Sequence, residues 1–248
     1  MGNLLSQWDT SHRQWPLPRL PWMMKQTWNN LLFAHYPIKY EVLEKLVPNA
    51  LPLDSFDGIT WVGIVSFEMS GVRLRGVPRI PGLSRFSQVN VRTYVSLDGK
   101  PGVYFLSIDA GNWLAATMAR NFIHIPYMHA KGSLNDNGNF IRIESGRQKD
   151  RDVKLACTYR PISESFYAVK GSFDEWLTER YCFYTVNKKG DPLRCDILHK
   201  PWPLQKVEAE YSQNTLLSGQ GIIVDSERPT ILHFSKEMDV RAWPLLQI

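Results

Sequence analysis

Stretches rich in β-branched and aromatic residues recur along the chain, and several alternate hydrophobic with polar positions, which predicts many β-strands. Turn-forming residues separate these stretches, including Asp98-Gly99 and a polar run at 135–139, and each predicts a tight hairpin. The spacing predicts an antiparallel arrangement for most neighbouring strands. The strand-like stretches are residues 28–36, 59–72, 89–97, 103–110, 127–148 (a hairpin), 153–159, 181–184, 192–200, 205–211 and 230–240.

Three shorter stretches favour helices. Apolar residues recur at helical spacing over 40–47, where Pro48 ends the pattern, and again over 112–122. Ser172 followed three residues later by Glu175 is a capping-box signature for the start of a third helix. Many strands with two or three short helices predict a mainly β (α+β) fold, an antiparallel sheet curled into a cone or barrel around a cavity.

We expect one domain over residues 1–248. Barrels and sandwiches of this length often form a single unit, and the pattern shows no internal repeat or low-complexity boundary. Residues 1–24 hold three tryptophans and three prolines, which predicts an extended lead-in that docks aromatic rings.

The composition and net charge of the chain indicate which kinds of molecule it can bind. The chain has 44% hydrophobic residues and a formal net charge of +5, enough to favour an anionic small molecule but too little for a nucleic-acid surface. Three widely spaced cysteines are a poor disulfide framework, and no apolar run approaches a membrane span, so we expect a cytoplasmic protein with no membrane partner. Arginines at 73–85 lie among glycine and proline, typical of a solvated loop.

Several longer motifs follow one order along the chain from about Trp28 onward. They are WNNLLFAHYPI (28–38), LVPNALPLDSFDG (46–58), NVRTYV (90–95), GKPGVYFLSIDA (99–110), LTERYCFY (177–184) and HKPWPLQ (199–205). These motifs resemble the YqjF-like family of uncharacterised bacterial proteins. Families of this kind are similar to acetoacetate decarboxylases in fold, with a sheet wrapped around an internal cavity.

Matching the decarboxylase motif residue by residue implies that the imine-forming lysine is missing. Arg120 and Pro126 have the matching separation, but Tyr127 stands where that lysine would be. Gln88 likewise stands where a glutamate would precede the strand that enters the cavity. A phenol cannot form an imine and an amide cannot act as a general base, so the resemblance implies no acetoacetate decarboxylase activity by that route.

The remaining candidates point to ligand binding. Gln88, Asn90 and Arg92 alternate along one strand and would aim polar groups at a common space if that face is inward. If that face is solvated instead, the valines between them supply the core. Arg120 would clamp a carboxylate or pair with a structural acid, and Tyr127 would bind a carbonyl or be a core tyrosine.

Other catalytic and metal-binding signals are weak. Glu179 and Arg180 lie among aromatic residues, and the favoured interpretation is that one of them forms a structural ion pair. The alternative interpretation is that Glu179 is a catalytic acid. Cys195 and His199 lack the paired spacing of a zinc site, and His35 and His233 are expected to be buried and hydrogen-bonded. The sequence therefore predicts no metal and no cofactor.

Three functional hypotheses follow. The first is binding of a small, partly apolar, anionic or carbonyl-containing molecule through Gln88, Asn90, Arg92, Arg120 and Tyr127. The second is a lyase or isomerase acting on a keto or aromatic acid, with Tyr127 and Arg120 polarising a carbonyl and Glu68 or Glu179 moving a proton. The third is a structural or interaction protein whose barrel is filled by its own aromatics. A homo-oligomer is compatible with all three.

Overall fold

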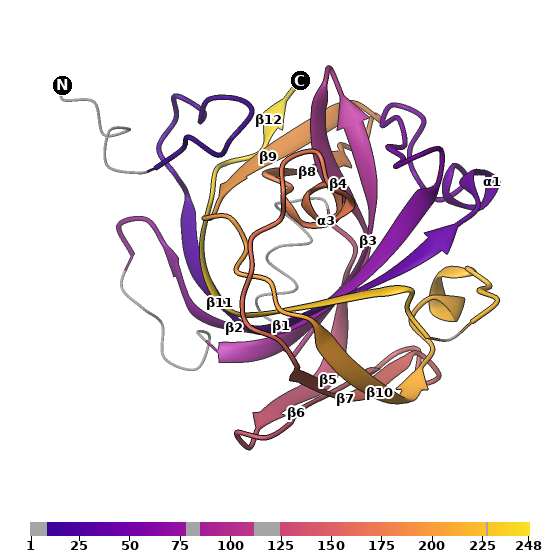
Figure 1. Ribbon diagram of the computed structural model, residues 1–248. Helices are drawn as coiled ribbons and strands as arrows, with labels where there is room; N and C mark the ends of the chain where they lie inside the picture. The colour runs from indigo at the N-terminus through magenta and orange to yellow at the C-terminus, as the bar shows by residue number, and fades with distance from the viewer. Residues whose placement is uncertain (1–8, 78–84, 112–124, 227) are drawn as a thin grey trace.

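The computed structural model of the protein describes residues 9–77, 85–111, 125–226 and 228–248. Strand dominates these ranges, and the helices are short (Figure 1). The elements are β1 (Met24–Ile38), α1 (Tyr40–Leu43), β2 (Thr60–Leu74), β3 (Arg85–Leu97), β4 (Lys100–Ala110), β5 (Tyr127–Asp136), β6 (Ile141–Arg147), β7 (Lys154–Pro161), α3 (Phe173–Thr178), β8 (Cys182–Val186), β9 (Pro192–Leu198), β10 (Val207–Asn214), the 3₁₀ turn η2 (Ser218–Gln220), β11 (Ile231–Ala242) and β12 (Leu246–Gln247).

The described strands form one sheet that closes into a ring. The pairing runs β1–β2–β3–β4, continues through β8 and β9 to β11, and returns to β1. Figure 1 views this ring with α3 inside its outline. The predicted fold class is confirmed, although the sheet is mixed, because β4 pairs with β5 and with β8 in parallel.

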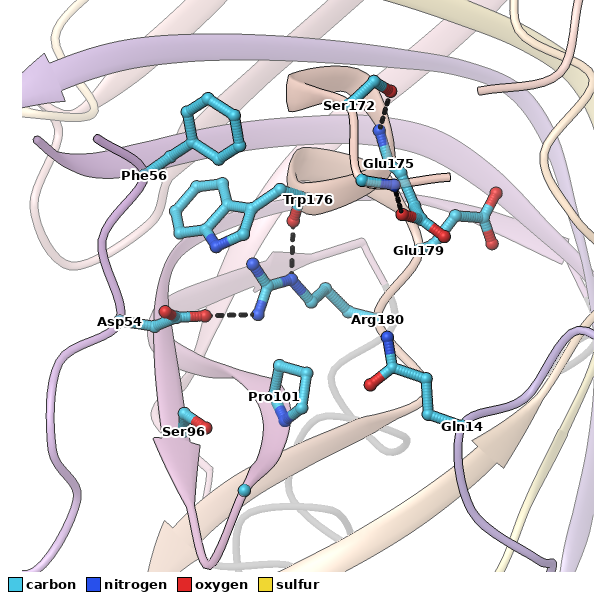
Figure 2. A pocket seen from close by; sticks show the side chains of 12 residues that line it. Gln14, Asp54, Phe56, Ser96, Pro101, Ser172, Glu175, Trp176, Glu179 and Arg180 are labelled. Atoms are coloured by element: carbon cyan, nitrogen blue, oxygen red, sulfur yellow. Dashed lines mark hydrogen bonds and ion pairs between the residues drawn. The ribbon is translucent and has the colours of Figure 1, made fainter. Parts of the chain in front are cut away.

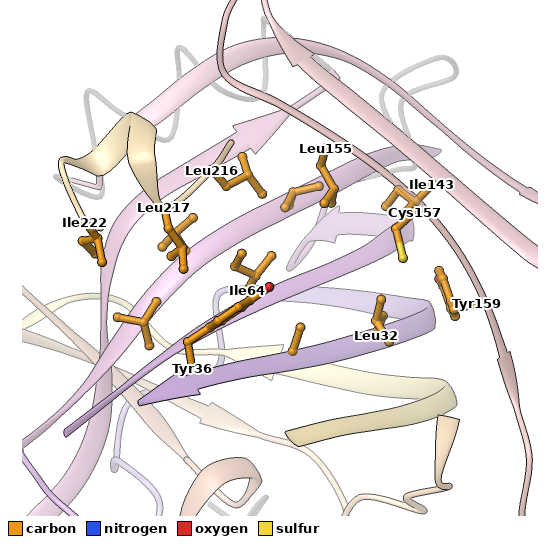
Figure 3. Packing of buried hydrophobic residues seen from close by; sticks show 14 of the residues in the cluster. Leu32, Tyr36, Ile64, Ile143, Leu155, Cys157, Tyr159, Leu216, Leu217 and Ile222 are labelled. Atoms are coloured by element: carbon orange, nitrogen blue, oxygen red, sulfur yellow. The ribbon is translucent and has the colours of Figure 1, made fainter. Parts of the chain in front are cut away.

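A second arm of the sheet covers one outer wall of the ring. It leaves β4 through β5 and continues antiparallel through β6, β7 and β10. Figure 3 shows the core between the two layers, in which Leu32 and Ile64 of the ring face Ile143 and Leu155 of the arm. The strands of this wall also pack a second hydrophobic cluster on their other face, so the wall is buried on both sides.

Inside the ring, a separate aromatic and aliphatic cluster packs on the opposite face of the same strands. Phe33 and Phe67 belong to it, together with Trp202 from the segment after β9. The Trp202 ring meets Phe33 edge-on at 5.1 Å between centroids. At another point α3 packs Leu177 against Tyr94 and Trp61. The ring interior is therefore lined by aromatic side chains.

The predicted helices differ in outcome. Helix α1 is a single turn, shorter than the predicted 40–47, and no side-chain hydrogen bond caps it. Helix α3 begins as predicted, with the Ser172 side chain accepting from the Glu175 backbone N–H. The helix predicted over 112–122 lies outside the described residues. Among those described, no helix is long and apolar enough to cross a membrane.

The described part of the lead-in, residues 9–23, contacts the ring. Residues 9–23 hold no helix. The Trp15 indole N–H donates to Asp196 on β9 at 3.2 Å, and the buried Arg13 reaches the same carboxylate at 3.4 Å. Leu17 packs with Trp243 near the end of the chain. The Asp196 carboxylate on β9 therefore holds the lead-in against the ring.

Ring closure also depends on a glycine at the β4–β8 contact. A Cβ at Gly102 would lie 2.7 Å from Cys182 Sγ and 2.7 Å from a ring carbon of Tyr184. We expect Gly102→Ala to lower the free energy of unfolding by about 1–3 kcal/mol in urea denaturation, because the buried neighbours must shift. The matched control is Gly146→Ala, whose Cβ would meet only Lys154 Cγ at 3.7 Å. Equal stability of the two variants would contradict this account of the closure.

Candidate functional site

The polar residues predicted on β3 lie on the inward face of the ring. Gln88, Asn90 and Arg92 are 5%, 4% and 8% exposed, so the alternative that this face is solvated is wrong. The intervening Val89 and Val91 belong to the core beneath the outer arm. Strand β3 is therefore buried on both faces, and its inward face is polar.

Arg92 is the charged member of this face. Its guanidinium carbon lies 5.6 Å from the Phe33 ring centre and 5.9 Å from that of Tyr94. Nε and Nη2 are buried without a hydrogen-bond partner, and no carboxylate of the described residues lies within ion-pair distance of the side chain. A buried guanidinium normally has a carboxylate partner, because its desolvation is costly. Arg92 is an exception within the part of the chain that the structure describes.

Other buried polar atoms on the same inward face also have unmet hydrogen-bonding capacity. They are Oε1 of Gln88, Oδ1 of Asn90 and both ring nitrogens of His35. Burial lowers the pKa of His35 well below its usual range, and the nearby charge of Arg92 lowers it further. Native proteins pair nearly all such atoms, so a cluster of unmet ones indicates a place for water or a ligand.

Gly63 makes room for this cluster. In the β1–β2–β3 register Gly63 stands between His35 and Arg92. A Cβ there would lie 3.1 Å from His35 Cδ2 and 3.3 Å from the Tyr94 hydroxyl oxygen. Glycine in the middle of a buried strand typically marks a close approach, and here the His35 ring and the Tyr94 hydroxyl lie over it.

A second buried arginine, Arg180, also lies close to Tyr94. Arg180 donates to Asp54 Oδ2 at 2.7 Å and to the Trp176 carbonyl at 2.6 Å (Figure 2). Its guanidinium carbon lies 4.9 Å from the Tyr94 ring centre. Two guanidinium groups therefore lie close to the Tyr94 ring, and of these only Arg180 has a carboxylate partner among the described residues. The local charge favours an anion.

Arg180 also lines a pocket, which Figure 2 shows from close by. Its volume is about 370 Å³. Glu179, one of the predicted catalytic candidates, lines it. The Glu179 carboxylate accepts from the Tyr181 hydroxyl and, at 2.9 Å, from the backbone N–H of Trp202. Burial raises the pKa of Glu179, and these hydrogen bonds oppose that rise. They tie Glu179 to the fold and away from the β3 face, while the predicted structural ion pair is made by Arg180 with Asp54.

Tyr127 joins the β3 face through the sheet register. It pairs with Ile108 of β4, which pairs with Asn90 of β3, so the three side chains lie in one row on one face. Burial raises the pKa of Tyr127 to about 12, and proximity to the Cys195 thiol adds to the rise. The phenol is therefore a neutral hydroxyl at physiological pH. Arg120, the other residue predicted beside it, lies outside the described residues.

The remaining candidates do not join this face. Glu68 alternates with Phe67 along β2 and pairs with the exposed Arg85 at 2.9 Å. No three of the described His, Cys, Asp and Glu residues gather to hold a metal ion. The three cysteines are free and buried. All lysines of the sequence fall in the described ranges, and none is buried.

Sequence reasoning missed two parts of this site. It treated His35 as an ordinary buried histidine, although a glycine in the middle of an apolar strand, Gly63, was a signal that a side chain crosses that point. It also did not connect Asp174 with His233, whose Nε2 lies 3.1 Å from Asp174 Oδ1. No local pattern links these two residues, because the contact depends on how α3 enters the ring.

Comparison with known proteins places the chain among relatives that share this fold. A family model, DUF2071, described as an uncharacterised conserved protein, matches residues 25–239. The uncharacterised protein YqjF of Bacillus subtilis (strain 168) is 44% identical over 224 residues, covering 90% of this chain and 92% of the relative.

Solved structures extend the likeness in fold. An acetoacetate decarboxylase aligns with a TM-score of 0.61 at 15% identity, covering 93% of this chain and 90% of the other. The enduracididine biosynthesis enzyme MppR, complexed with pyruvate, aligns with a TM-score of 0.59 at 8% identity, covering 96% and 94%. At these identities the likeness establishes the fold alone.

Proposed function

The chain belongs to the DUF2071 family of uncharacterised conserved proteins, and from this premise we propose that its ring interior binds a small carboxylate-bearing molecule. The observation that carries the proposal is the buried guanidinium of Arg92, with Nε and Nη2 unpartnered. Gln88, Asn90 and Tyr127 complete the polar side of the site. No lysine imine takes part.

The energetics of burial support an anionic ligand. Taking a charged group out of water costs several kcal/mol unless a partner compensates for the lost hydration. A carboxylate can accept two parallel hydrogen bonds from one guanidinium, which is the strongest geometry available to Arg92. The ligand would therefore supply the negative charge that the described residues do not supply.

The surrounding groups suggest what the rest of the ligand looks like. The unpartnered oxygens of Gln88 and Asn90 accept hydrogen bonds, so they fit a hydroxyl, enol or amine on the ligand. Phe33, Phe67 and Trp202 offer apolar and aromatic surface nearby. Small 2-keto acids and aromatic acids combine these features, and the fold relative MppR was solved with pyruvate.

A structural or interaction role is the second candidate. The observation in its favour is the packing of Trp202 and Leu204 with Phe33 and Phe67, which fills part of the ring with the protein's own side chains. An interior filled throughout would leave no space for a ligand. Binding measurements separate this candidate from the first.

Thermal-shift screening against 2-keto acids and aromatic carboxylates tests the proposal, with the matching primary amides as neutral controls. A ligand at 100 times its Kd adds about 2.7 kcal/mol to stability, which gives a readily measured rise in Tm. We expect carboxylates to raise Tm and the amides to leave it unchanged. If no acid of either class raises Tm, the result would favour a ring interior filled by the protein's own side chains.

Borohydride reduction in the presence of acetoacetate is expected to leave the protein mass unchanged. An imine needs a lysine amine that is neutral part of the time, which desolvation provides, and no lysine of this chain is buried. Lys131, on β5 near Tyr127, is exposed. Intact-protein mass spectrometry measures the result, with a lysine-dependent decarboxylase as positive control. A trapped adduct would show that a lysine of this chain reaches the ligand.

A further inference from the structure

His233 and Asp174 form a pair that connects solvent with the ring interior. His233 is the cross-strand partner of Phe33 and lies on the same inward face. The imidazole Nε2 lies 3.1 Å from Asp174 Oδ1, and Nδ1 is buried without a hydrogen-bond partner. His233 is 5% exposed, whereas the Asp174 side chain on α3 is 39% exposed. Asp174 is therefore accessible to water, whereas His233 is buried at the ring interior.

The pair fixes the chemical state of the imidazole. A carboxylate only accepts hydrogen bonds, so the contact with Asp174 places the imidazole proton on Nε2 and leaves a lone pair on Nδ1. Burial lowers the pKa of His233, and the Asp174 carboxylate opposes that change. A neutral imidazole with one defined tautomer and a free lone pair has the features of a general base.

The position of His233 relative to Arg92 suits one small ligand. The two residues flank Phe33, with the Arg92 guanidinium carbon 5.6 Å from the ring centre. Their strands, β11 and β3, are three strand spacings apart, about 14 Å along the wall. The curvature of the ring and the length of the arginine side chain shorten that separation. His35 lies between them, its ring 6.4 Å from that of His233.

We infer that His233 transfers a proton to and from a carbon next to the carbonyl of a 2-keto acid whose carboxylate Arg92 holds. This inference rests on the proposed function, because the ligand must first occupy the Arg92 site. It adds a reaction class, enolisation, to the binding role. Asp174 is a positioning residue, since it contacts His233 rather than the ligand.

The step balances without any further reagent. Nδ1 takes a proton from C3 of the keto acid, and the C–H bonding pair forms the C2–C3 double bond. The carbonyl π pair moves onto oxygen, and the nearby guanidinium stabilises the resulting negative charge. Return of a proton from Nδ1 to C3 restores the ketone. In D₂O the imidazole exchanges with solvent, so C3 acquires deuterium.

A purely structural histidine would be expected to use both nitrogens. Here the surroundings provide one partner, Asp174, and leave Nδ1 with none in the described structure. An unmet buried acceptor is unfavourable in the free protein and becomes satisfied only when a donor enters. A functional role accounts for retaining it.

Exchange of the C3 protons of phenylpyruvate in D₂O, followed by ¹H NMR, tests the inference. We expect the protein to accelerate exchange at least about 100-fold over buffer, the lower range for general base catalysis. His233→Gln keeps a donor for Asp174 but has no base, so exchange should fall to the buffer rate. His129→Gln, at an exposed site on β5, is the matched control and should retain the acceleration.

Calorimetric titration of phenylpyruvate into the same proteins separates binding from chemistry. Binding by the wild type without accelerated exchange would overturn the role of His233 and leave the proposed function standing. Absence of binding would overturn both. We expect His233→Gln to lose the accelerated exchange while its Kd for phenylpyruvate changes less than about threefold. An unaltered thermal unfolding curve would show that the variant is folded.

The positioning role of Asp174 has its own readout. In Asp174→Ala the ¹⁵N shifts of the His233 ring should change from a single Nε2–H form to a mixture of tautomers, and exchange should slow. Unchanged shifts would show that Asp174 does not set the tautomer. Slower exchange with unchanged shifts would also count against the pair.

Discussion

Replacing Arg147 with methionine is expected to lower the free energy of unfolding by about 3–5 kcal/mol at pH 8, measured by urea denaturation. Arg147 on β6 holds Asp109 on β4, with Nε 3.0 Å from each carboxylate oxygen. Its Nη2 also donates to Ser107 Oγ at 2.8 Å. Asp109 and Arg147 are 2% and 7% exposed, so the variant would leave a buried carboxylate without its partner.

The penalty should depend on pH in a direction set by Asp109. Burial raises the pKa of Asp109 to about 6, and Arg147 opposes that rise, so removing Arg147 raises the pKa further. A pKa raised above the unfolded value means that the folded state binds the proton more tightly, and stability falls as pH rises toward the folded pKa. At pH 5 the carboxyl is mostly protonated in both proteins, so the penalty should be smaller there than at pH 8.

The double variant Asp109→Leu with Arg147→Met is the control for this pair. Replacing both partners of a buried ion pair by apolar groups is often neutral, whereas removing one leaves a buried charge. We expect the double variant to recover most of the stability lost in Arg147→Met and to lose its pH dependence between pH 5 and 8. A double variant as unstable as the single one would contradict this explanation.

Arg92→Met is expected to have the opposite effect on the unliganded protein. Arg92 is buried as deeply as Arg147 but has no carboxylate partner among the described residues. Removing an uncompensated charge should raise the free energy of unfolding by about 1 kcal/mol or more. Urea denaturation of the unliganded protein measures the change. A loss of several kcal/mol would show that Arg92 has a structural partner after all.

The contrast between these arginines explains why the site is assigned to Arg92. Binding sites commonly retain groups that reduce stability, because the ligand rather than the fold satisfies them. Arg147 and Arg180 each have a carboxylate partner and stabilise contacts between elements. Arg92 lies over two aromatic rings, and its Nε and Nη2 have no hydrogen-bond partner.

The sequence was most informative where alternation decides which face a side chain takes. The period of two along β3 predicted that Gln88, Asn90 and Arg92 share a face, and strand β3 does present them together. The alternation did not decide whether the polar face points into the ring or toward solvent. In either case the valines between the polar residues lie on the opposite face of the strand and are apolar. The covering arm β5–β6–β7–β10 buries the valines, and α3 with Trp202 covers the polar side.

Contacts between distant strands were beyond the reach of local patterns. The parallel pairing of β4 with β8 closes the ring, and the parallel pairing of β4 with β5 extends the sheet into the outer arm. No turn motif in the sequence predicts either pairing. The partners of Asp109 and His233 likewise come from strands and helices far away in the sequence. Resemblance to a known fold predicted the ring, and only the structure could supply these pairings.

Calorimetric titration of phenylpyruvate into wild-type protein and Arg92→Met is the most direct measurement of the central claim, that the interior binds an anion on Arg92. Removing one partner of a buried charge pair typically costs 2–5 kcal/mol of binding, so we expect Kd to rise by at least about 30-fold. Arg142→Met, on the exposed side of β6, should bind like the wild type. Equal affinity of Arg92→Met and the wild type would contradict the claim.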